Sequence, residues 1–483
     1  MYKITVLPEK QVLFAQPGER LMDILRAAGL SPDAPCGGHG SCGKCRVTAN
    51  GQPVFACQTA VTEDMTVILP EACSGTILSA GISGDSARHT PQDGFLLAFD
   101  LGTTTVVGYL LDGKTGKELS CAGARNPQTA FGADVISRIQ HALKNGMTEL
   151  TDVIRRCIRE LTFTLCEKAG ITPAQITAVS VVGNPAMEQL LLGISPENLA
   201  KIPFAPVLTQ PQVFCGRDII DLWENAKLLI APNISGYVGG DTVACMLSTA
   251  LHRQEQITLL VDIGTNGEMV LGNRDRAVAC SAAAGPALEG ANIQFGMRGQ
   301  SGAIDHVWLE SGVFCCSTIG GGEAAGICGS GLIDAVSAAL DAGYINSRGK
   351  ILPPDGKIRL TESIFLTQED IRQLQLAKGA IAAGIRLLCR YLGIDITDIQ
   401  QVYLAGAFGN FMSPASACRI GLLPRELTQK ITPVGNAAGS GAKQMVCQPE
   451  VFACTGELVA RTEFLELAAM PDFRRCFAES MRF

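Results

Sequence analysis

Hydrophobic and polar residues alternate near the start of the chain in a pattern that predicts a small mixed sheet around one helix. The stretches KITV and VLFA flank the polar segment LPEKQ, as in a β-hairpin. Apolar residues then recur at helical spacing from Leu21 to Ala28. Further on, CRVTANGQPVFACQT predicts two strands around an Asn50-Gly51 turn, and MTVILP predicts another strand. We therefore expect a β-grasp unit over residues 1–76.

The pattern changes after this unit. Residues 77–94 are rich in Gly, Ser, Pro and Asp, which is typical of a flexible linker. Beyond the linker, FLLAFDLGTTTVVGYLL predicts two apolar strands joined by a tight turn. The same phrase returns as LLVDIGTNGEMVLGN, where Asp262 follows Asp100 by 162 residues. A repeat at this separation indicates an internal duplication, so we expect an α/β body of two subdomains, about 95–255 and 256–483.

Composition narrows the classes of function. With 483 residues, 47% of them apolar and 18% charged, the chain should form several well-packed domains. The net charge of -7 and the lack of long Lys/Arg runs argue against nucleic-acid binding. The start MYKITVLPEKQ lacks the pattern of an export signal, and no apolar stretch is long enough to span a membrane. We expect a cytoplasmic protein.

The 19 cysteines fall into two groups. Most are scattered through apolar stretches, where a thiol serves as a small buried hydrophobe, and their odd number argues against a disulfide framework. Four have the spacing C-x5-C-x2-C-x11-C, and these are Cys36, Cys42, Cys45 and Cys57. Three thiols on a glycine-rich loop, with a fourth on a nearby strand, match the plant-type [2Fe–2S] arrangement with one extra residue in the first gap. Zinc or unliganded thiols are the alternatives, although structural zinc usually takes two C-x2-C pairs.

The duplicated turns carry residue types that suit a nucleotide. Glycine lets backbone N–H groups approach phosphate oxygens, threonine hydroxyls add donors, and an aspartate at a strand end can hold Mg²⁺ directly or through water. A third element, VYLAGAFGN, predicts a buried strand that ends in small residues against which adenosine can lie, and no GxxxxGK[ST] motif occurs. The expected ATP-binding residues are Gly102, Thr103, Thr104, Thr105, Gly264, Thr265, Asn266, Gly406, Ala407 and Gly409.

Carboxylates near these turns are the catalytic candidates. Asp100 and Asp262 are placed to hold the metal ion. Asp241, at an expected helix start in NISGYVGGDTVACML, and Glu268 are candidates for orienting an attacking water. Two other stretches, ARNPQTAFGADVISRI and VVGNPAMEQLLLG, are expected to enter helices, the second with Asn184 as its cap.

The three nucleotide elements look like the phosphate-1, phosphate-2 and adenosine motifs of the acetate and sugar kinase/Hsp70/actin superfamily. This resemblance implies two ribonuclease-H-like subdomains within residues 95–483, with ATP between them. Domain closure around the nucleotide can then drive another event.

Over its whole length the chain resembles the reductive activators of corrinoid proteins. The matching phrases include PCGGHGSCGKC, DLGTTTV, NPQTAFGADVISRI, GNPAMEQLLLG, VDIGTNGE, SAAAGPALEG, CGSGLIDA, LAGAFGN and VGNAAGSGA. The resemblance implies ATP-dependent reduction of an inactive Co(II) corrinoid methyl carrier to Co(I), in anaerobic one-carbon metabolism. It also implies a [2Fe–2S] cluster, Mg²⁺, a corrinoid-protein partner and an external low-potential electron donor, and it leaves room for a homodimer.

Two features of the family are not expected in this chain. The stretch between cluster unit and body is too short for the extra domain of some members, and the tail PDFRRCFAESMRF has too few cysteines for two [4Fe–4S] units. Two other functions remain open. One is an ATP-driven activator of a different low-potential enzyme, and the other is a ferredoxin-tethered small-molecule kinase.

Overall fold

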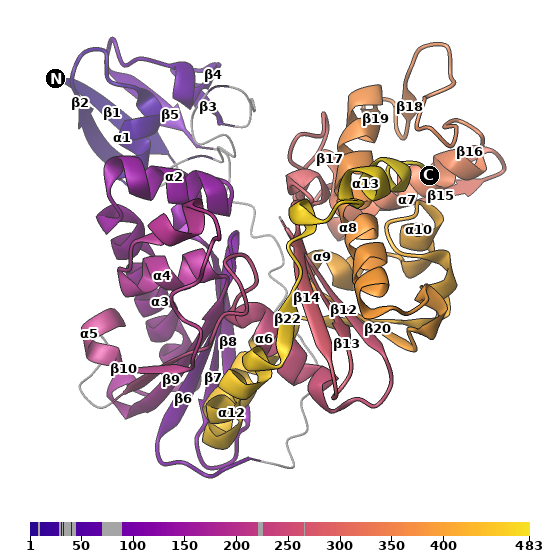
Figure 1. Cartoon of the computed structure of the whole chain (residues 1–483). Helices are drawn as coiled ribbons and strands as arrows, with labels where there is room; N and C mark the ends of the chain where they lie inside the picture. The colour runs from indigo at the N-terminus through magenta and orange to yellow at the C-terminus, as the bar shows by residue number, and fades with distance from the viewer. Residues whose placement is uncertain are drawn as a thin grey trace.

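The N-terminal unit is a five-stranded mixed sheet that holds one helix (Figure 1). The computed structural model describes residues 1–7, 10–28, 30, 32, 40, 45–69, 89–220, 226–264 and 266–483. The sheet has the order β2-β1-β5-β3-β4, with β1 Tyr2–Leu7, β2 Gln11–Ala15, β3 Arg46–Ala49, β4 Gln52–Phe55 and β5 Met65–Ile68. Inward-facing Ile4 and Val6 pack against Leu21 and Leu25 of α1 (Leu21–Ala27) in a small apolar core. The expected β-grasp fold is confirmed.

The first half of the body is built on a six-stranded sheet of order β10-β11-β9-β6-β7-β8. Its strands are β6 Phe95–Leu101, β7 Thr105–Asp112, β8 Glu118–Arg125, β9 Ile176–Gly183, β10 Gln212–Cys215 and β11 Lys227–Ile230. Strands β6 and β7 form an antiparallel hairpin, whereas β6, β9 and β11 run parallel. The central strand β6 is apolar at nearly every position because both of its faces are covered.

The second half repeats this plan with a sheet of order β21-β20-β12-β13-β14-β22. Its strands are β12 Thr258–Ile263, β13 Gly267–Gly272, β14 Ala277–Ala282, β20 Gln401–Ala405, β21 Ile431–Gly435 and β22 Thr462–Phe464. Here too an antiparallel hairpin, β12–β13, is followed by parallel pairing of β12 with β20 and of β20 with β21. The shared order of five strands bears out the duplication that the two Asp-x-Gly-Thr phrases indicate.

Helices cover both faces of each sheet. The outer face of the first sheet packs on α2 Val135–Asn145, α3 Thr148–Ala169 and α4 Pro185–Leu192, near the short α5 Gly216–Ile220. The second half carries α7 Gly329–Asp341, α8 Gln368–Leu392, α9 Gly406–Phe411, α10 Pro414–Arg419 and α13 Phe473–Ser480. Between the two sheets lie α6 Gly240–Ser248 and α11 Ala437–Cys447, with α12 Pro449–Ala460 beside them (Figure 1). One apolar core therefore joins the two halves through α6 and α11.

Short strands extend the second half away from the main sheet. They form a three-stranded sheet, β16-β15-β17, and a separate hairpin, β18–β19. Their bounds are β15 Ala303–Glu310, β16 Val313–Thr318, β17 Gly326–Ile327, β18 Ile358–Arg359 and β19 Phe365–Leu366. Within the described part of the chain, no helix has the length and apolarity that a membrane span requires.

The expected linker over residues 77–94 lies outside the described residues up to position 88. The described end of this stretch is tied to the body. Thr90 donates its hydroxyl to Glu450 at 3.1 Å, and the Gln92 side chain donates to the carbonyl of Val446 at 2.8 Å. The chain therefore reaches β6 along α11 and α12.

Candidate functional site

Two of the four expected cluster ligands face each other in the N-terminal unit. Cys45 directly precedes β3, and Cys57 lies in a 3₁₀ turn, Ala56–Gln58, that directly follows β4. Both side chains are buried, and their sulfur atoms lie 3.2 Å apart. The hairpin β3–β4 sets this approach, because it brings its two ends together. Cys36 and Cys42 lie outside the described residues.

The first expected phosphate loop is a tight turn between β6 and β7. A Cβ atom at Gly102 would lie 2.8 Å from the carbonyl oxygen of Thr105, so this turn accepts only glycine without a shift. Thr103 and Thr104 follow, and the Thr104 hydroxyl donates to the carboxylate of Glu289 at 3.1 Å. Glu289 belongs to the second half of the body, so the loop already contacts the opposite subdomain.

Three side chains from the first half hold this loop in place. The amide of Asn126 donates to the carbonyl of Gly102 at 2.8 Å, and the guanidinium of Arg138 donates to the carbonyl of Thr103. Asn184, which caps α4 as expected, donates to the hydroxyl of Thr103 at 3.1 Å. Both stretches that had no role at the sequence level therefore support the phosphate loop.

The second phosphate loop joins β12 to β13. The Gly264 N–H donates to the carbonyl of Asn266 at 2.9 Å, which closes the turn, and Thr265 lies outside the described residues. Asp262 and Glu268 are direct cross-strand partners on this hairpin, so their side chains share one face of the sheet. The Asn266 side chain hydrogen-bonds to Glu268.

The adenosine element lies against this second loop. Gly406 begins α9 with φ of +87°, and a Cβ there would lie 2.6 Å from Oδ1 of Asp262. Glycine is therefore required both by the backbone conformation and by the approach to the carboxylate. Gly409 is buried, and a Cβ there would lie 2.9 Å from Leu404, so its small size serves packing of α9 on β20. The side chain of Ala407 is outside the described part of the structure.

The expected catalytic aspartates are brought together from three elements. Asp100 lies near the end of β6, Asp241 lies in the first turn of α6, and Asp262 lies near the end of β12. Burial raises the pKa of Asp100 and of Asp241 to about 7 and that of Asp262 to about 6, and the negative charges of neighbouring aspartates add to the rise for the first two. Burial also raises the pKa of Glu268 well above its ordinary value. A group of mutually repelling carboxylates is a site that a cation would stabilise.

The geometry favours a cation shared with a nucleotide over a cage made of protein alone. In the described part of the chain, no three His, Cys, Asp or Glu side chains are arranged as a metal site. Mg²⁺ usually takes one or two carboxylates, several waters and substrate phosphates. Asp100 and Asp262 at the ends of the two phosphate hairpins fit that pattern.

Sequence reasoning missed several polar partners of these carboxylates. Asn436 caps α11 and donates to Oδ2 of Asp100 at 2.8 Å, and the thiol of the buried Cys245 lies 3.7 Å from Oδ2 of Asp262. The phrase VGN precedes a helix both at Asn184 and at Asn436, and both asparagines reach the first hairpin. That repeated phrase is a signal that could have identified Asn436. No such signal marks Cys245.

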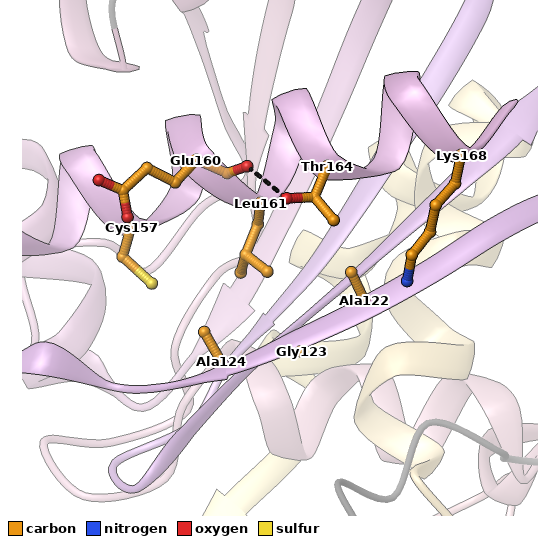
Figure 2. Close-up of a pocket in the computed structure, with 8 residues that line it drawn as sticks. All are labelled: Ala122, Gly123, Ala124, Cys157, Glu160, Leu161, Thr164 and Lys168. Carbon is orange, nitrogen blue, oxygen red and sulfur yellow. Dashed lines mark hydrogen bonds between the residues drawn. The ribbon is translucent and has the colours of Figure 1, made fainter. Parts of the chain in front are cut away.

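A groove elsewhere on the molecule is separate from these carboxylates. It has a volume of about 340 Å³ and lies between the edge strand β8 and α3 (Figure 2). Small residues, Ala122 to Ala124, form one wall, and Glu160 and Lys168 stand along the other. It contains none of the expected nucleotide residues.

Comparisons with known proteins agree along the whole chain. Three family models match: a 2Fe-2S iron-sulfur cluster binding domain over residues 4–74, the RACo middle region over 95–254, and the C-terminal domain of RACo, the ASKHA domain, over 256–483. The corrinoid activation enzyme RamQ of Eubacterium limosum is 35% identical over 406 residues, which cover 78% of this chain and 68% of that relative.

Two further matches are more distant. The Co(II) methylated amine-specific corrinoid protein reductase of Methanosarcina barkeri is 29% identical over 384 residues, which cover 73% of this chain and 70% of the relative. A solved structure described as a reductive activator for corrinoid, iron-sulfur protein matches with a TM-score of 0.75 and 28% identity, covering 100% of this chain and 98% of that one. With its iron–sulfur unit, its duplicated ATPase-type body and these relatives, the chain belongs to the family of reductive activators of corrinoid proteins.

Proposed function

We propose that this enzyme uses ATP to reduce the inactive Co(II) form of a corrinoid methyl-carrier protein to Co(I). One observation carries the proposal: a single chain joins a buried thiol pair in a β-grasp unit to a body whose two phosphate hairpins end in facing aspartates. The first part suits electron transfer and the second suits nucleotide-driven closure. The relatives named for corrinoid activation support this pairing.

The cluster is proposed to be a plant-type [2Fe–2S] centre on Cys36, Cys42, Cys45 and Cys57. When bound, it supplies one electron at a time, and one electron is what the change from Co(II) to Co(I) requires. A plant-type centre has a reduction potential of about -400 mV. Raising an electron by a further ~100 mV takes about 2.3 kcal/mol. The nucleotide would supply this difference by stabilising one conformation of the complex over another.

Within the body we assign Asp100 and Asp262 to Mg²⁺ and Asp241 to the attacking water. Asp241 has a pKa of about 7, so a large fraction is ionised at neutral pH and can accept a proton. Burial raises the pKa of Glu268 well above its ordinary value, which favours its protonated form and suits it less to that role. The pair Asp241→Asn and Glu268→Gln tests the assignment. Asp241→Asn should reduce kcat for ATP hydrolysis by at least tenfold, whereas Glu268→Gln should retain most of the wild-type kcat.

The decisive experiment follows Co(I) formation by absorbance. Chemically reduced protein is mixed with a Co(II) corrinoid protein, with and without ATP. We expect Co(I) only with ATP, and we expect Cys57→Ser to abolish it along with the visible absorption of the cluster. The matched control is Cys454→Ser, because Cys454 is exposed on α12 in the body. Formation of Co(I) that ignores ATP, or that survives Cys57→Ser, would contradict the proposal.

The remaining assignments are part of the same proposal. We propose an external low-potential reductant as the electron donor, a cytoplasmic site of action, and a homodimer as the assembly to test by light scattering. A small-molecule kinase would consume ATP only with an acceptor substrate. ATP hydrolysis by the isolated protein with no such acceptor present would therefore argue against that alternative.

A further inference from the structure

The segment from Asn126 to His141 touches two parts of the molecule. Asn126 and Arg138 hold the first phosphate loop, and Phe131, which lies between them in the sequence, contacts the N-terminal unit. In Figure 1 this unit is next to α2, into which the segment leads. The corresponding stretch, NPQTAFGADVISRI, has no catalytic role in the proposed function. Its contacts explain what it can do.

The phosphate-loop end grips the backbone of three consecutive loop residues. The N–H of Asn126 donates to the carbonyl of Thr104 at 2.9 Å, and its side-chain amide donates to the carbonyl of Gly102. The guanidinium of Arg138 donates to the carbonyl of Thr103, which lies between them. A shift of this loop on nucleotide binding must therefore move or break contacts with the segment.

Arg138 also ties the segment together internally. Its side chain is fully buried, and it donates to the carbonyl of Gly132 at 3.0 Å and contacts the side-chain oxygen of Gln128 at 3.4 Å. Among the described residues, no carboxylate forms an ion pair with this guanidinium. Burial lowers its pKa to about 9, so it stays charged at neutral pH. A buried cation whose hydrogen-bond partners are neutral oxygens and the sulfur of Met187 gains stability when a triphosphate is brought to the adjoining loop.

Phe131, midway along the segment, contacts the N-terminal unit and packs on a second aromatic ring of the segment. The guanidinium carbon of Arg26, in α1, lies 6.0 Å from the ring centroid of Phe131, the outer limit for a cation–π contact. Phe131 packs edge-on against His141 with centroids 5.0 Å apart. Its N–H donates to the carbonyl of Gln128 at 3.0 Å, next to the atoms that Arg138 holds. The contact with Arg26 is thus one short segment away from the phosphate loop.

We propose that residues 126–141 form a docking surface for the chain's own cluster-bearing unit and that a triphosphate at the first phosphate loop tightens this docking. The nucleotide draws Arg138 and the loop together, which orders the segment and fixes Phe131 against Arg26. The enzyme then holds its electron carrier more firmly in this position when ATP is bound. The inference rests on the proposed function, because it requires nucleotide at that loop.

Thermodynamic reciprocity supplies the test. If ATP tightens docking by a given factor, then docking tightens ATP binding by the same factor, so weakening the docking must weaken ATP binding by up to that factor. Dissociation constants for a non-hydrolysable MgATP analogue are measured anaerobically by calorimetry on the full, cluster-loaded chain. We expect Arg26→Ala and Phe131→Ala each to raise Kd about two- to fivefold, the range that one such contact allows. The double variant should be no weaker than either single one.

Arg20→Ala is the matched control, since it removes an equal charge near the same helix from a side chain that pairs with Asp23. It should leave Kd unchanged. Arg138→Lys keeps the charge but loses the planar fork, so in that background Arg26→Ala should have no further effect. Hydrogen exchange gives a second readout. The analogue should slow exchange of the amides of α1 in the wild type and leave it unchanged in Arg138→Lys.

Each contrary result has a distinct meaning. An Arg26→Ala protein with wild-type Kd, or an equal loss in Arg20→Ala, would overturn the docking relay and leave the proposed function intact. A wild-type chain that binds no ATP would overturn both. Phe131 packs within the body, so its variant can also disturb folding there. Arg26 lies in α1 of the N-terminal unit, and its variant cannot disturb the folding of the body. The Arg26→Ala result therefore decides the matter.

Discussion

Replacing Asp100 with Asn should stabilise the nucleotide-free protein at high pH even though it removes a proposed metal ligand. Burial raises the pKa of this carboxyl from 3.8 to about 7. The unfolded chain therefore releases the proton near pH 4, whereas the folded chain keeps it until about pH 7. Because the unfolded state binds fewer protons across this window, stability falls as pH rises through it and reaches its minimum above pH 7.

The magnitude follows from the width of the window. Each pKa unit corresponds to about 1.36 kcal/mol, so a rise of about three units costs the folded state about 4 kcal/mol at high pH. At pH 5.5 the folded state has already lost part of this stability, and the rest is lost between pH 5.5 and about pH 7. The stabilisation by Asp100→Asn should therefore grow by about 2 kcal/mol over that interval.

The assay is urea unfolding at pH 5.5 and pH 8.5, in EDTA and without nucleotide. Proteolysis of the body measures the unfolded fraction at each urea concentration. Asp112→Asn is the control at the end of the neighbouring strand. There the Thr115 hydroxyl and backbone N–H lower the pKa of the carboxyl, so its contribution is constant between these pH values. The reasoning fails if Asp100→Asn gains no stability between pH 5.5 and pH 8.5. It also fails if this variant hydrolyses MgATP at the wild-type rate.

Three further predictions test the site. Gly406→Ala forces an alanine into a left-handed backbone conformation and places its methyl group 2.6 Å from Asp262. We expect at least a tenfold loss of ATP affinity by calorimetry. Unchanged affinity would count against the proposed adenosine element. Asn436→Ala removes the cap bond to Gly439 and the hydrogen bond that lowers the pKa of Asp100, so the unfolding free energy should fall by about 1 kcal/mol and the pH midpoint of MgATP binding should rise. MgATP binding should release protons at pH 6.5 and almost none at pH 8.5, because a cation favours the ionised aspartates. Equal binding heats at pH 6.5 in buffers of different ionisation enthalpy would contradict that expectation.

Local spacing was enough to predict the fold. The hairpin and helix periods of the N-terminal unit depend on neighbouring residues, and so does each Asp-x-Gly-Thr turn. The duplication followed because the same phrase occurs twice, and the matching strand orders of the two sheets bear it out. The helix cap at Asn184 and a helix start beside Asp241 were also predictable, since both depend on local sequence.

The partners of the proposed catalytic groups were not predictable in this way. Asn436 reaches Asp100 across 336 residues of sequence, and Glu289 reaches Thr104 across 185. These pairs form because α11 packs between the two sheets and because the two halves meet at their hairpins. Both conditions depend on how whole subdomains are placed.

The sequence alone determined what the chain is made of: a cysteine loop suited to an iron–sulfur cluster, and two phosphate hairpins with an aspartate each. The tertiary structure decided what those parts share. It buries three aspartates close together, and this burial raises the pKa of each. It also places one segment, residues 126–141, between a phosphate loop and the cluster-bearing unit. The physical reason is that residue type is a local property, whereas desolvation and contact depend on everything that packs around a side chain.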